Sequence, residues 1–271
     1  MKQIAAHIPL VLIAAVWLLP IVWMIIVAFK PSGSNVVDVR QWLVPNFTLD
    51  NFRSLLSSKQ FHPMNWMLNS VLVATVTTGL VLMIAALAAY GFSNFNFAGK
   101  KLWMVIIMFG MMIPREATVI PIYVMFNRLN LLNQIISLIL PNLALPMAFI
   151  ILKKFFDSIP RSLYEAATVD GCGSLRKLFS IALPLSRSAF ASVGIFVFLN
   201  IWNDFLWPFL AISAPDKMTV PIGILLFNSE YQVERVLPLT ASTLLSIPVI
   251  LVFFIFQKNI IKGVAMSGIK G

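Results

Sequence analysis

The sequence predicts an all-α membrane protein with six transmembrane helices, and three observations lead to this prediction. Of the 271 residues, 59% are hydrophobic and only 11% are charged, whereas soluble domains carry about 25% charged residues. Six apolar runs reach the length of about 20 residues that a helix needs to cross a bilayer. The lysine and arginine residues are unevenly divided among the segments that join these runs.

The apolar runs are predicted to be the spans of a single transmembrane domain, residues 1–271. Their approximate limits are 8–29, 66–92, 102–126, 135–156, 189–212 and 236–256. The first run is longer than the apolar core of a signal peptide, which has about 7–15 residues, and no small-residue cleavage site follows it. We therefore expect it to be retained as a span.

Prolines interrupt the third run at Pro114 and Pro121 and the fourth run at Pro141 and Pro146. A proline removes one helical hydrogen bond, and spanning helices tolerate it because neighbouring helices or water satisfy the freed carbonyl. Since the chain contains 16 prolines, we expect broken or kinked helices rather than a smooth bundle.

The positions of the charged residues predict that both termini lie on the cytoplasmic side. With the N-terminus inside, 12 of the 20 lysine and arginine residues fall on that side, with only three of the 10 acidic residues. Cytoplasmic segments of membrane proteins are enriched in lysine and arginine. The net charge of +10 is then mostly a matter of membrane orientation, and no nucleic-acid partner is predicted.

The polar residues show no pattern typical of a metal or catalytic site. The single cysteine, Cys172, excludes a disulfide within the chain. The two histidines, His7 and His62, lie near predicted loop ends. No cluster of His, Cys and carboxylates has metal-ligand spacing, and no Ser-His-Asp set is indicated. We predict neither a metal nor a cofactor.

Residues 157–188, between the fourth and fifth spans, are predicted to form a cytoplasmic loop with two short helices. Asp157 or Ser158 is suited to cap the first helix, over about 160–170, in which a proline occupies the first turn. Gly171 can end this helix because glycine accepts a left-handed backbone.

The second helix of the loop is predicted to begin near Ser174 and to stop by Pro184. On the first helix, spacings of three, four and seven residues place four side chains on one face. They are Leu163, Ala166, Ala167 and Asp170. Two interpretations remain open: this face packs against the chain's own helix ends, or it docks a cytoplasmic partner.

Nine positions of this loop follow a fixed pattern. They are Glu165, Ala166, Ala167, Asp170, Gly171, Phe179, Ile181, Leu183 and Pro184. In this pattern the chain resembles the EAA loop of bacterial ABC importer permeases. Cys172 stands where that family usually has alanine, and Ser188 stands where a proline often follows the Leu-Pro pair.

The resemblance extends along most of the chain. The segments 69–93, 113–134 and 202–208 are similar to the second, third and fifth spans of carbohydrate-uptake permeases, and the terminal KGVAMSGIKG resembles the tail of the second maltose-type subunit. The resemblance implies that this tail, with Ser267, Gly268 and Lys270, reaches the interface of two ATPase subunits.

The resemblance also implies a set of partners and a mechanism. The expected partners are a second homologous permease subunit in a heterodimer, two cytoplasmic ATPase subunits, an extracytoplasmic substrate-binding protein and the membrane lipid. Glu165 and its helix would sit in a cleft of an ATPase, so that ATP-driven closure switches the permease between inward-open and outward-open states. The expected location is the cytoplasmic (inner) membrane of a bacterium or archaeon.

The chain itself is not expected to hydrolyse ATP. The segment 263–270 has two glycines at the spacing of a phosphate-binding loop, but its lysine is one residue late and no serine or threonine follows it. ATP hydrolysis is therefore assigned to the partner subunits, and the chain is not predicted to be an enzyme.

Polar groups within the fifth span are candidates for the translocation path, because such groups are costly in a membrane. They are Asn200, Trp202, Asn203 and Asp204. Amide and aromatic groups suit a sugar, but the same groups also suit hydrogen bonds between helices and an aromatic belt. Arg115 and Glu116 are expected to pair with each other or with helix ends.

The predicted function is ATP-driven import of a saccharide, most simply an oligosaccharide, by alternating access. Import of glycerol 3-phosphate by a related permease is the nearest alternative. A secondary transporter that works without partners and an intramembrane enzyme are alternatives from other classes. The outer segments 31–65 and 213–235 are expected to face the binding protein. A short amphipathic helix is predicted after Thr48, and it is expected either to lie on the membrane surface or to meet that protein.

Overall fold

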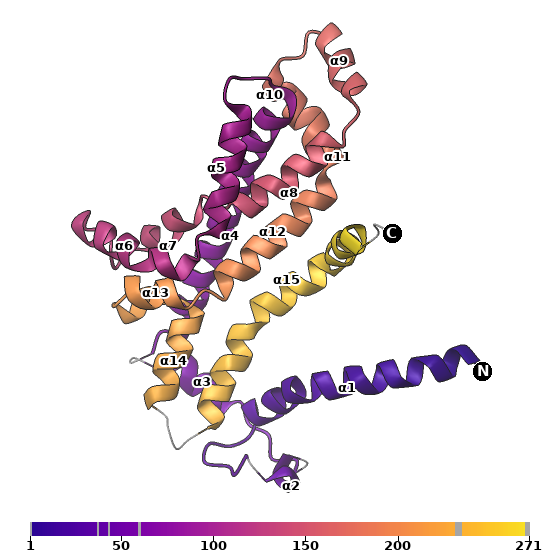
Figure 1. The fold of residues 1–271 in the computed structure, drawn as a ribbon. Coiled ribbons are helices and arrows are strands. Elements are labelled where there is room, and N and C mark those ends of the chain that lie inside the picture. The colour runs from indigo at the N-terminus through magenta and orange to yellow at the C-terminus, as the bar shows by residue number, and fades with distance from the viewer. Residues whose placement is uncertain (1, 37, 43, 59–60, 231–234, 269–271) are drawn as a thin grey trace.

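The computed structural model describes residues 2–36, 38–42, 44–58, 61–230 and 235–268, and within these residues it contains helices and no strands (Figure 1). In chain order the elements are α1 (Lys2–Ala28), α2 (Val39–Trp42), α3 (Asp50–Ser57), α4 (Pro63–Asn94), α5 (Lys100–Met112), α6 (Arg115–Arg128), α7 (Ile135–Ile139), η1 (Leu140–Asn142), α8 (Pro146–Asp157), α9 (Arg161–Val169), α10 (Ser174–Lys177), η2 (Leu178–Ala182), α11 (Leu183–Leu185), α12 (Arg187–Trp202), α13 (Leu206–Ala211), η3 (Pro215–Lys217), α14 (Val220–Glu230) and α15 (Val236–Gly268).

Three long helices of the described chain are apolar enough to cross a bilayer unbroken. The qualifying segments are Pro9–Ala28 of α1, Pro63–Asn94 of α4 and Val236–Ile255 of α15. They correspond to the first, second and sixth predicted spans. The sixth differs at its end, because α15 continues as a helix to Gly268, whereas a separate tail was expected from residue 257.

The other three predicted spans are broken. α5 and α6 meet at 95°, and the segment Ile135–Asn142 meets α8 at 49°. Pro114 precedes α6 and Pro146 is the first residue of α8, so prolines start new helices where a continuous helix would have clashed. The expectation of broken helices is confirmed. If each bent pair counts as one span, the described helices provide up to six.

The fifth predicted span, 189–212, is also interrupted. α12 ends at Trp202, and α13 is a separate short helix. At its other end α12 makes an angle of 83° with the segment Ser174–Leu185. The fifth apolar run therefore consists of most of the 16-residue helix α12, a turn and the short helix α13.

α4 is the central helix of the bundle and packs against both α8 and α12 (Figure 1). Its contact face is made of small residues, among them Ala85, Ala86 and Ala89, which are buried with Leu152 of α8 and Val193 of α12. Small residues let helix backbones approach closely, which is the main source of helix association inside a membrane.

A second apolar cluster holds the other end of α4 and contains Trp66, Trp202 and Trp207. The Trp66 indole N–H donates to the carbonyl of Pro215 at 2.8 Å, and that of Trp207 donates to Ser137 at 2.8 Å. The buried rings of Trp66 and Trp207 therefore have their polar atoms satisfied, as large aromatic side chains require.

α1 diverges from this bundle toward the N-terminus (Figure 1). It contacts α15 and buries Val27 and Ala28 near its C-terminal end. Most of its other described side chains are exposed, and Trp17 is 76% exposed. An apolar surface of this length requires lipid or another protein to cover it.

A substitution at Gly223 of α14 would test how tightly this helix packs against Trp66. A Cβ at this position would lie 2.2 Å from the Trp66 ring, so Gly223→Ala is expected to destabilise the fold by about 3 kcal/mol, the upper part of the range for overpacking. Thermal unfolding of the purified protein in detergent measures the effect. Gly79→Ala, in the middle of α4 with nothing within 4 Å, is the control, and equal melting of the two variants would contradict the packing.

Candidate functional site

The helix α9 lies at one end of the molecule, and α2, α3 and α14 lie toward the other (Figure 1). It covers Arg161–Val169, within one residue of the predicted limits. The predicted cap is wrong, because Asp157 and Ser158 complete α8 instead. Asp157 accepts from Lys153 at 2.6 Å, and the Ser158 hydroxyl donates to the carbonyl of Phe155 at 2.6 Å.

The end of α9 has the hydrogen bonds of a Schellman motif. The Cys172 N–H donates to the carbonyl of Ala167 at 2.8 Å, and the Gly171 N–H donates to that of Thr168 at 3.0 Å. Gly171 has φ +75°, a backbone conformation that costs other residues about 1–2 kcal/mol. The prediction that Gly171 ends this helix is confirmed.

Only one side of α9 is buried, and this side consists of Tyr164 and Ala167. The opposite face is exposed and consists of Ser162, Glu165, Ala166 and Val169; we call it the α9 outer face. Leu163, which is 43% exposed, and Asp170 lie at its edge. The predicted face therefore divides, because Ala167 packs against this chain while Ala166 points outward.

Tyr164 holds α9 on the bundle and was not singled out from the sequence. Its ring lies 6.1 Å from that of Tyr90 of α4, which also contacts Phe156 of α8 at 6.4 Å. Burial raises the pKa of the Tyr164 phenol above its ordinary value. The apolar pair Tyr164 and Ala167, three residues apart, was the available signal for this inner face.

The second helix of the loop does not stop at Pro184, contrary to the prediction. A π-helical turn, η2, precedes it, and the Leu183 N–H donates to the carbonyl of Leu178, five residues back. This wider turn accommodates the proline ring without a clash, and the helix ends at Leu185. Lys177 donates to the Thr168 hydroxyl at 2.6 Å and thereby joins α10 to α9.

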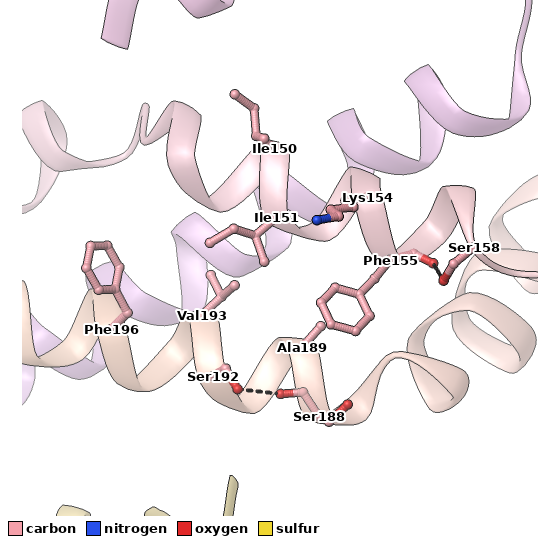
Figure 2. Close-up of a pocket in the computed structure, with 10 residues that line it drawn as sticks. All are labelled: Ile150, Ile151, Lys154, Phe155, Ser158, Ser188, Ala189, Ser192, Val193 and Phe196. Carbon is pink, nitrogen blue, oxygen red and sulfur yellow. Dashed lines mark hydrogen bonds between the residues drawn. The ribbon is translucent and has the colours of Figure 1, made fainter. Parts of the chain in front are cut away.

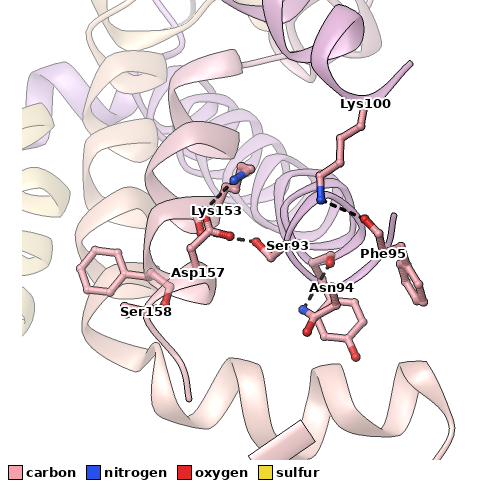
Figure 3. Close-up of polar contacts among 9 residues, drawn as sticks. Ser93, Asn94, Phe95, Lys100, Lys153, Asp157 and Ser158 are labelled. Atoms are coloured by element: carbon pink, nitrogen blue, oxygen red, sulfur yellow. Dashed lines mark hydrogen bonds and ion pairs between the residues drawn. The ribbon is translucent and has the colours of Figure 1, made fainter. Parts of the chain in front are cut away.

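Polar contacts fix the helix ends next to α9 (Figure 3). Besides the pair of Lys153 and Asp157, the Ser93 hydroxyl at the end of α4 donates to the carbonyl of Lys153 at 3.4 Å. The Lys100 ammonium donates to the carbonyl of Phe95 at 2.9 Å. These contacts join α4 to α8 and close the turn between α4 and α5.

The predicted C-terminal contact residues are only partly covered by the structure. Ser267 and Gly268 belong to the last turn of α15, of which only the backbone is described. Lys270 lies outside the described residues. Residues 263–268 are helical, so this described part of the near-match to a phosphate loop is not a loop.

The four polar candidates of the fifth span occupy different environments. Asn200 and Asn203 are exposed, and their amide nitrogens donate to carbonyls one turn back in α12, at 3.3 and 2.8 Å. Trp202 is 4% exposed and stacks on Phe198 within the core. The two asparagines and Trp202 therefore point to different surroundings.

Asp204 pairs with Arg115, at 2.5 Å between carboxylate and guanidinium. This corrects the expected pairing of Arg115 with Glu116 or helix ends. The Asp204 side chain is 8% exposed and that of Arg115 is 48% exposed, so the arginine compensates a nearly buried charge. The pair connects the start of α6 to the turn between α12 and α13.

A cavity of about 390 Å³ adjoins this ion pair. Its lining includes Arg115 at the α5–α6 break, Asn142 and Pro146 at the break before α8, and Trp207 of α13. The broken helices thus enclose a space with a few polar groups on apolar walls, which is typical of small-molecule sites. No group of three or more His, Cys, Asp or Glu among the described residues could hold a metal ion.

Comparisons with known proteins agree on one family. Residues 81–266 match the model of the binding-protein-dependent transport system inner membrane component. The chain is 35% identical to a putative ABC transporter permease protein ORF2 of Caldicellulosiruptor sp. strain Rt8B.4, over 95% of this chain and 94% of that protein. It is 31% identical to the trehalose/maltose transport system permease protein MalG of Thermococcus litoralis, over 100% and 98% of the two chains.

One solved structure has the same fold. It is a bacterial ABC transporter involved in the import of the acidic polysaccharide alginate, and it superposes with a TM-score of 0.79 at 23% identity, over 95% of each chain. At this identity the likeness concerns the arrangement of helices alone.

The pair of Arg115 and Asp204 is testable by a double-mutant cycle. Arg115→Met leaves a nearly buried carboxylate unpaired and is expected to cost about 1–3 kcal/mol. Asp204→Leu alone is expected to cost less, because the Arg115 that it leaves unpaired is half exposed, and the double variant Arg115→Met/Asp204→Leu should recover part of the loss. Thermal unfolding in detergent measures all three. Arg128→Met, at the exposed end of α6, is the control; independent effects of the two partners would show that the pair adds nothing.

Proposed function

This chain belongs to the family of binding-protein-dependent transport system inner membrane components, and we propose that it is the permease subunit of an ATP-driven importer that moves a saccharide into the cytoplasm. Its relatives are named as permeases, among them a trehalose/maltose transport system protein. In this proposal the chain lines the path, and separate ATPase subunits hydrolyse ATP.

The observation that carries the proposal is the α9 outer face. It presents Glu165, Ala166 and Val169 at one end of the molecule, and Val169 is 88% exposed. An exposed valine beside alanine and a carboxylate suits a partner surface with an apolar cleft and a cation. The ATPase subunits are the proposed partner, and Leu163, Asp170 and Gly171 border the contact.

Motion of α9 would reach the membrane through Tyr164. This ring contacts Tyr90 of α4, and α4 packs against α8 and α12. The Schellman turn at Gly171 and the hydrogen bond from Lys177 to Thr168 bind α9 to the helix that leads into α12. A displaced α9 would therefore pull on several spans together.

We propose six spans with both termini in the cytoplasm. α1, α4 and α15 are the unbroken spans, α5 with α6 and Ile135–Asn142 with α8 are two bent spans, and α12 with α13 is the remaining one. The α9 end is then the cytoplasmic end, and the second permease, the two ATPases and the extracytoplasmic binding protein complete the transporter. α15 would carry Ser267, Gly268 and Lys270 as a helical extension toward the ATPases. The family description, which names a binding protein and the inner membrane, supports the membrane location and the binding-protein partner.

For the path we propose the exposed amides of Asn200 and Asn203 as contacts for sugar hydroxyls. Trp202 is buried in the core, and Asp204 forms an ion pair with Arg115. We therefore propose that these two residues hold α12 and α13 in place and do not contact the sugar. Among the described residues that line the 390 Å³ cavity, Arg115 is the charged one, and it is neutralised by Asp204. A saccharide fits this arrangement better than glycerol 3-phosphate, which needs an unpaired cation.

Glu165→Ala is expected to lower uptake about tenfold or more, since a contact with a charged group contributes about 1.5–3 kcal/mol. The amount of protein in the membrane should be unchanged, because Glu165 is exposed. Uptake by cells and co-purification of the ATPases with the permease pair measure the effect. Asp216→Ala, an exposed carboxylate in the outer segment 213–235, should leave co-purification of the ATPases unchanged. If Glu165→Ala retains the ATPases and transports at the normal rate, docking by α9 is rejected. A stand-alone transporter would then be the better proposal.

The cargo class is tested by titrating the cognate binding protein with oligosaccharides and with glycerol 3-phosphate. We expect saturable binding of an oligosaccharide and none of the phosphate. In uptake of the sugar so identified, Asn200→Leu is expected to lose about 1 kcal/mol or roughly fivefold, the contribution of one hydrogen bond. Asn127→Leu, exposed on α6, is the control. Binding of glycerol 3-phosphate alone would overturn the saccharide assignment.

A further inference from the structure

The cavity of about 390 Å³ beside Arg115 lies where two broken helices come together. One break separates α5 from α6, and the other separates η1 from α8. The volume of the cavity lies within the range of about 300–1,000 Å³ that is usual for small-molecule sites. The path proposed above assigns no sugar contact to this cavity.

Each break frees a backbone carbonyl beside the cavity. Pro114 and Pro146 have no N–H, so neither can donate to the carbonyl four residues before it. Those two carbonyls belong to Gly110 and Asn142, and both residues line the cavity. Gly110 can line it only with backbone atoms. A Cβ at this position would meet nothing within 4 Å, so the space beside this backbone is open and a ligand can approach it closely.

The polar side chains of the lining have unused hydrogen-bonding capacity. Arg115 gives one guanidinium nitrogen to Asp204, and the other two donate to no group in the described part of the chain. The Asn142 amide nitrogen donates to the carbonyl of Leu138 at 2.9 Å, which leaves the amide oxygen as an acceptor. The cavity therefore offers both donors and acceptors, and they come from both of the broken helices.

In the orientation proposed above, the cavity lies within the hydrocarbon core of the membrane. α5 has 13 residues, which correspond to about 20 Å of helix, whereas the hydrocarbon core is about 30 Å thick. Lipid tails cannot hydrogen-bond to a guanidinium or to freed carbonyls at this depth. Such groups are tolerated there only against protein or in a cavity that admits water or a polar ligand.

We propose that this cavity is a subsite for one neutral glycosyl unit of the cargo, whose hydroxyls bind Arg115, Asn142 and the carbonyl of Gly110. A hydroxyl both donates and accepts, as this mixture of groups requires. The carbon–hydrogen faces of the sugar would lie against the apolar lining, which includes Ile113 and Leu145. The assignment rests on the proposed function and names a site for its cargo.

The charge of the lining indicates a neutral sugar. Arg115 is the charged residue among the described residues that line the cavity, and Asp204 neutralises it. A uronate would bring a second negative charge close to the Asp204 side chain, which is only 8% exposed. An unpaired charge is costly in such surroundings, so acidic saccharides are not expected here.

The larger groove of about 570 Å³ between α8 and α12 lacks these features (Figure 2). Both helices are continuous along it. The Ser158 and Ser192 hydroxyls in its lining donate to carbonyls of their own helices, at 2.6 and 2.9 Å, and its charged group is Lys154. We therefore place the subsite at the helix breaks.

The test uses Thr118→Cys, at a position that lines the cavity, in a Cys172→Ala background. The transporter is assembled with its partners in nanodiscs, and mass spectrometry follows the labelling of this thiol by N-ethylmaleimide during ATP turnover. Binding protein loaded with the neutral oligosaccharide found in the titration above should slow labelling about fivefold relative to unloaded binding protein, the factor 1 + [L]/Kd for an effective sugar concentration about four times Kd. Asn127→Cys, exposed on α6 and outside the cavity, is the control and should be labelled equally in both conditions.

Gly110→Phe separates occupancy of the cavity from motion of the helices, because the phenyl ring would fill the open space beside this backbone. In Gly110→Phe/Thr118→Cys we expect loaded and unloaded binding protein to give equal labelling, and uptake of the sugar should fall. Gly110→Ala, which adds a single methyl group, is the matched control and should keep both protection and uptake.

Three results would overturn the subsite. Labelling of Thr118→Cys that is equally fast with loaded and unloaded binding protein would show that no sugar enters the cavity, and equally slow labelling would show that the second permease covers it. Protection that persists in the Gly110→Phe variant would show that motion alone shields the thiol.

The class of sugar and the proposed function are tested separately. Saturation of the binding protein by trigalacturonate, and by none of the neutral oligosaccharides, would reject the neutral assignment. Sugar uptake by the wild type without protection of Thr118→Cys would remove the subsite and leave the importer function standing. Absence of saccharide uptake by the wild type would reject the proposed function itself.

Discussion

The structure depends on the close packing of α4 against α8 and α12. A bilayer provides little hydrophobic force between helices, so the bundle is held by the fit of small side chains such as Ala85, Ala86 and Ala89. Because these alanines allow close approach, Leu152 and Val193 can bury themselves against α4. The position of α9 depends on this packing, because Tyr164 of α9 contacts Tyr90 of α4.

The polar groups within the apolar bundle lie at the breaks between the bent helices. Pro114 and Pro146 end hydrogen-bonded runs and expose backbone groups, which a membrane protein tolerates only where they are buried in protein or line a cavity. The cavity beside Arg115 lies at these breaks, and Asp204 follows the end of α12. The unbroken helices α4 and α15 support the bundle, and the broken helices line the cavity beside Arg115.

The sequence located α9 to within one residue because its limits are set by local chemistry. Pro160 has a fixed φ and no N–H, and Gly171 accepts the left-handed conformation that ends the helix; both properties belong to the residue itself. The predicted face of α9 divides between the bundle and solvent: Tyr164 rests on Tyr90 of α4 and turns Ala167 inward, while Ala166 stays exposed. The continuation through Pro184 was missed because a π-turn leaves no mark in the sequence.

By itself the sequence determined the helical class, the family and the limits of α9, because apolar run length and motif spacing are properties of neighbouring residues. Only the tertiary structure decided that Arg115 pairs with Asp204, 89 positions away, that Trp202 is buried while Asn203 is exposed, and that Lys154 faces a groove while Lys153 is neutralised. These outcomes depend on which helices meet and at what angle. Adjacent residues can therefore have opposite roles that no local pattern distinguishes.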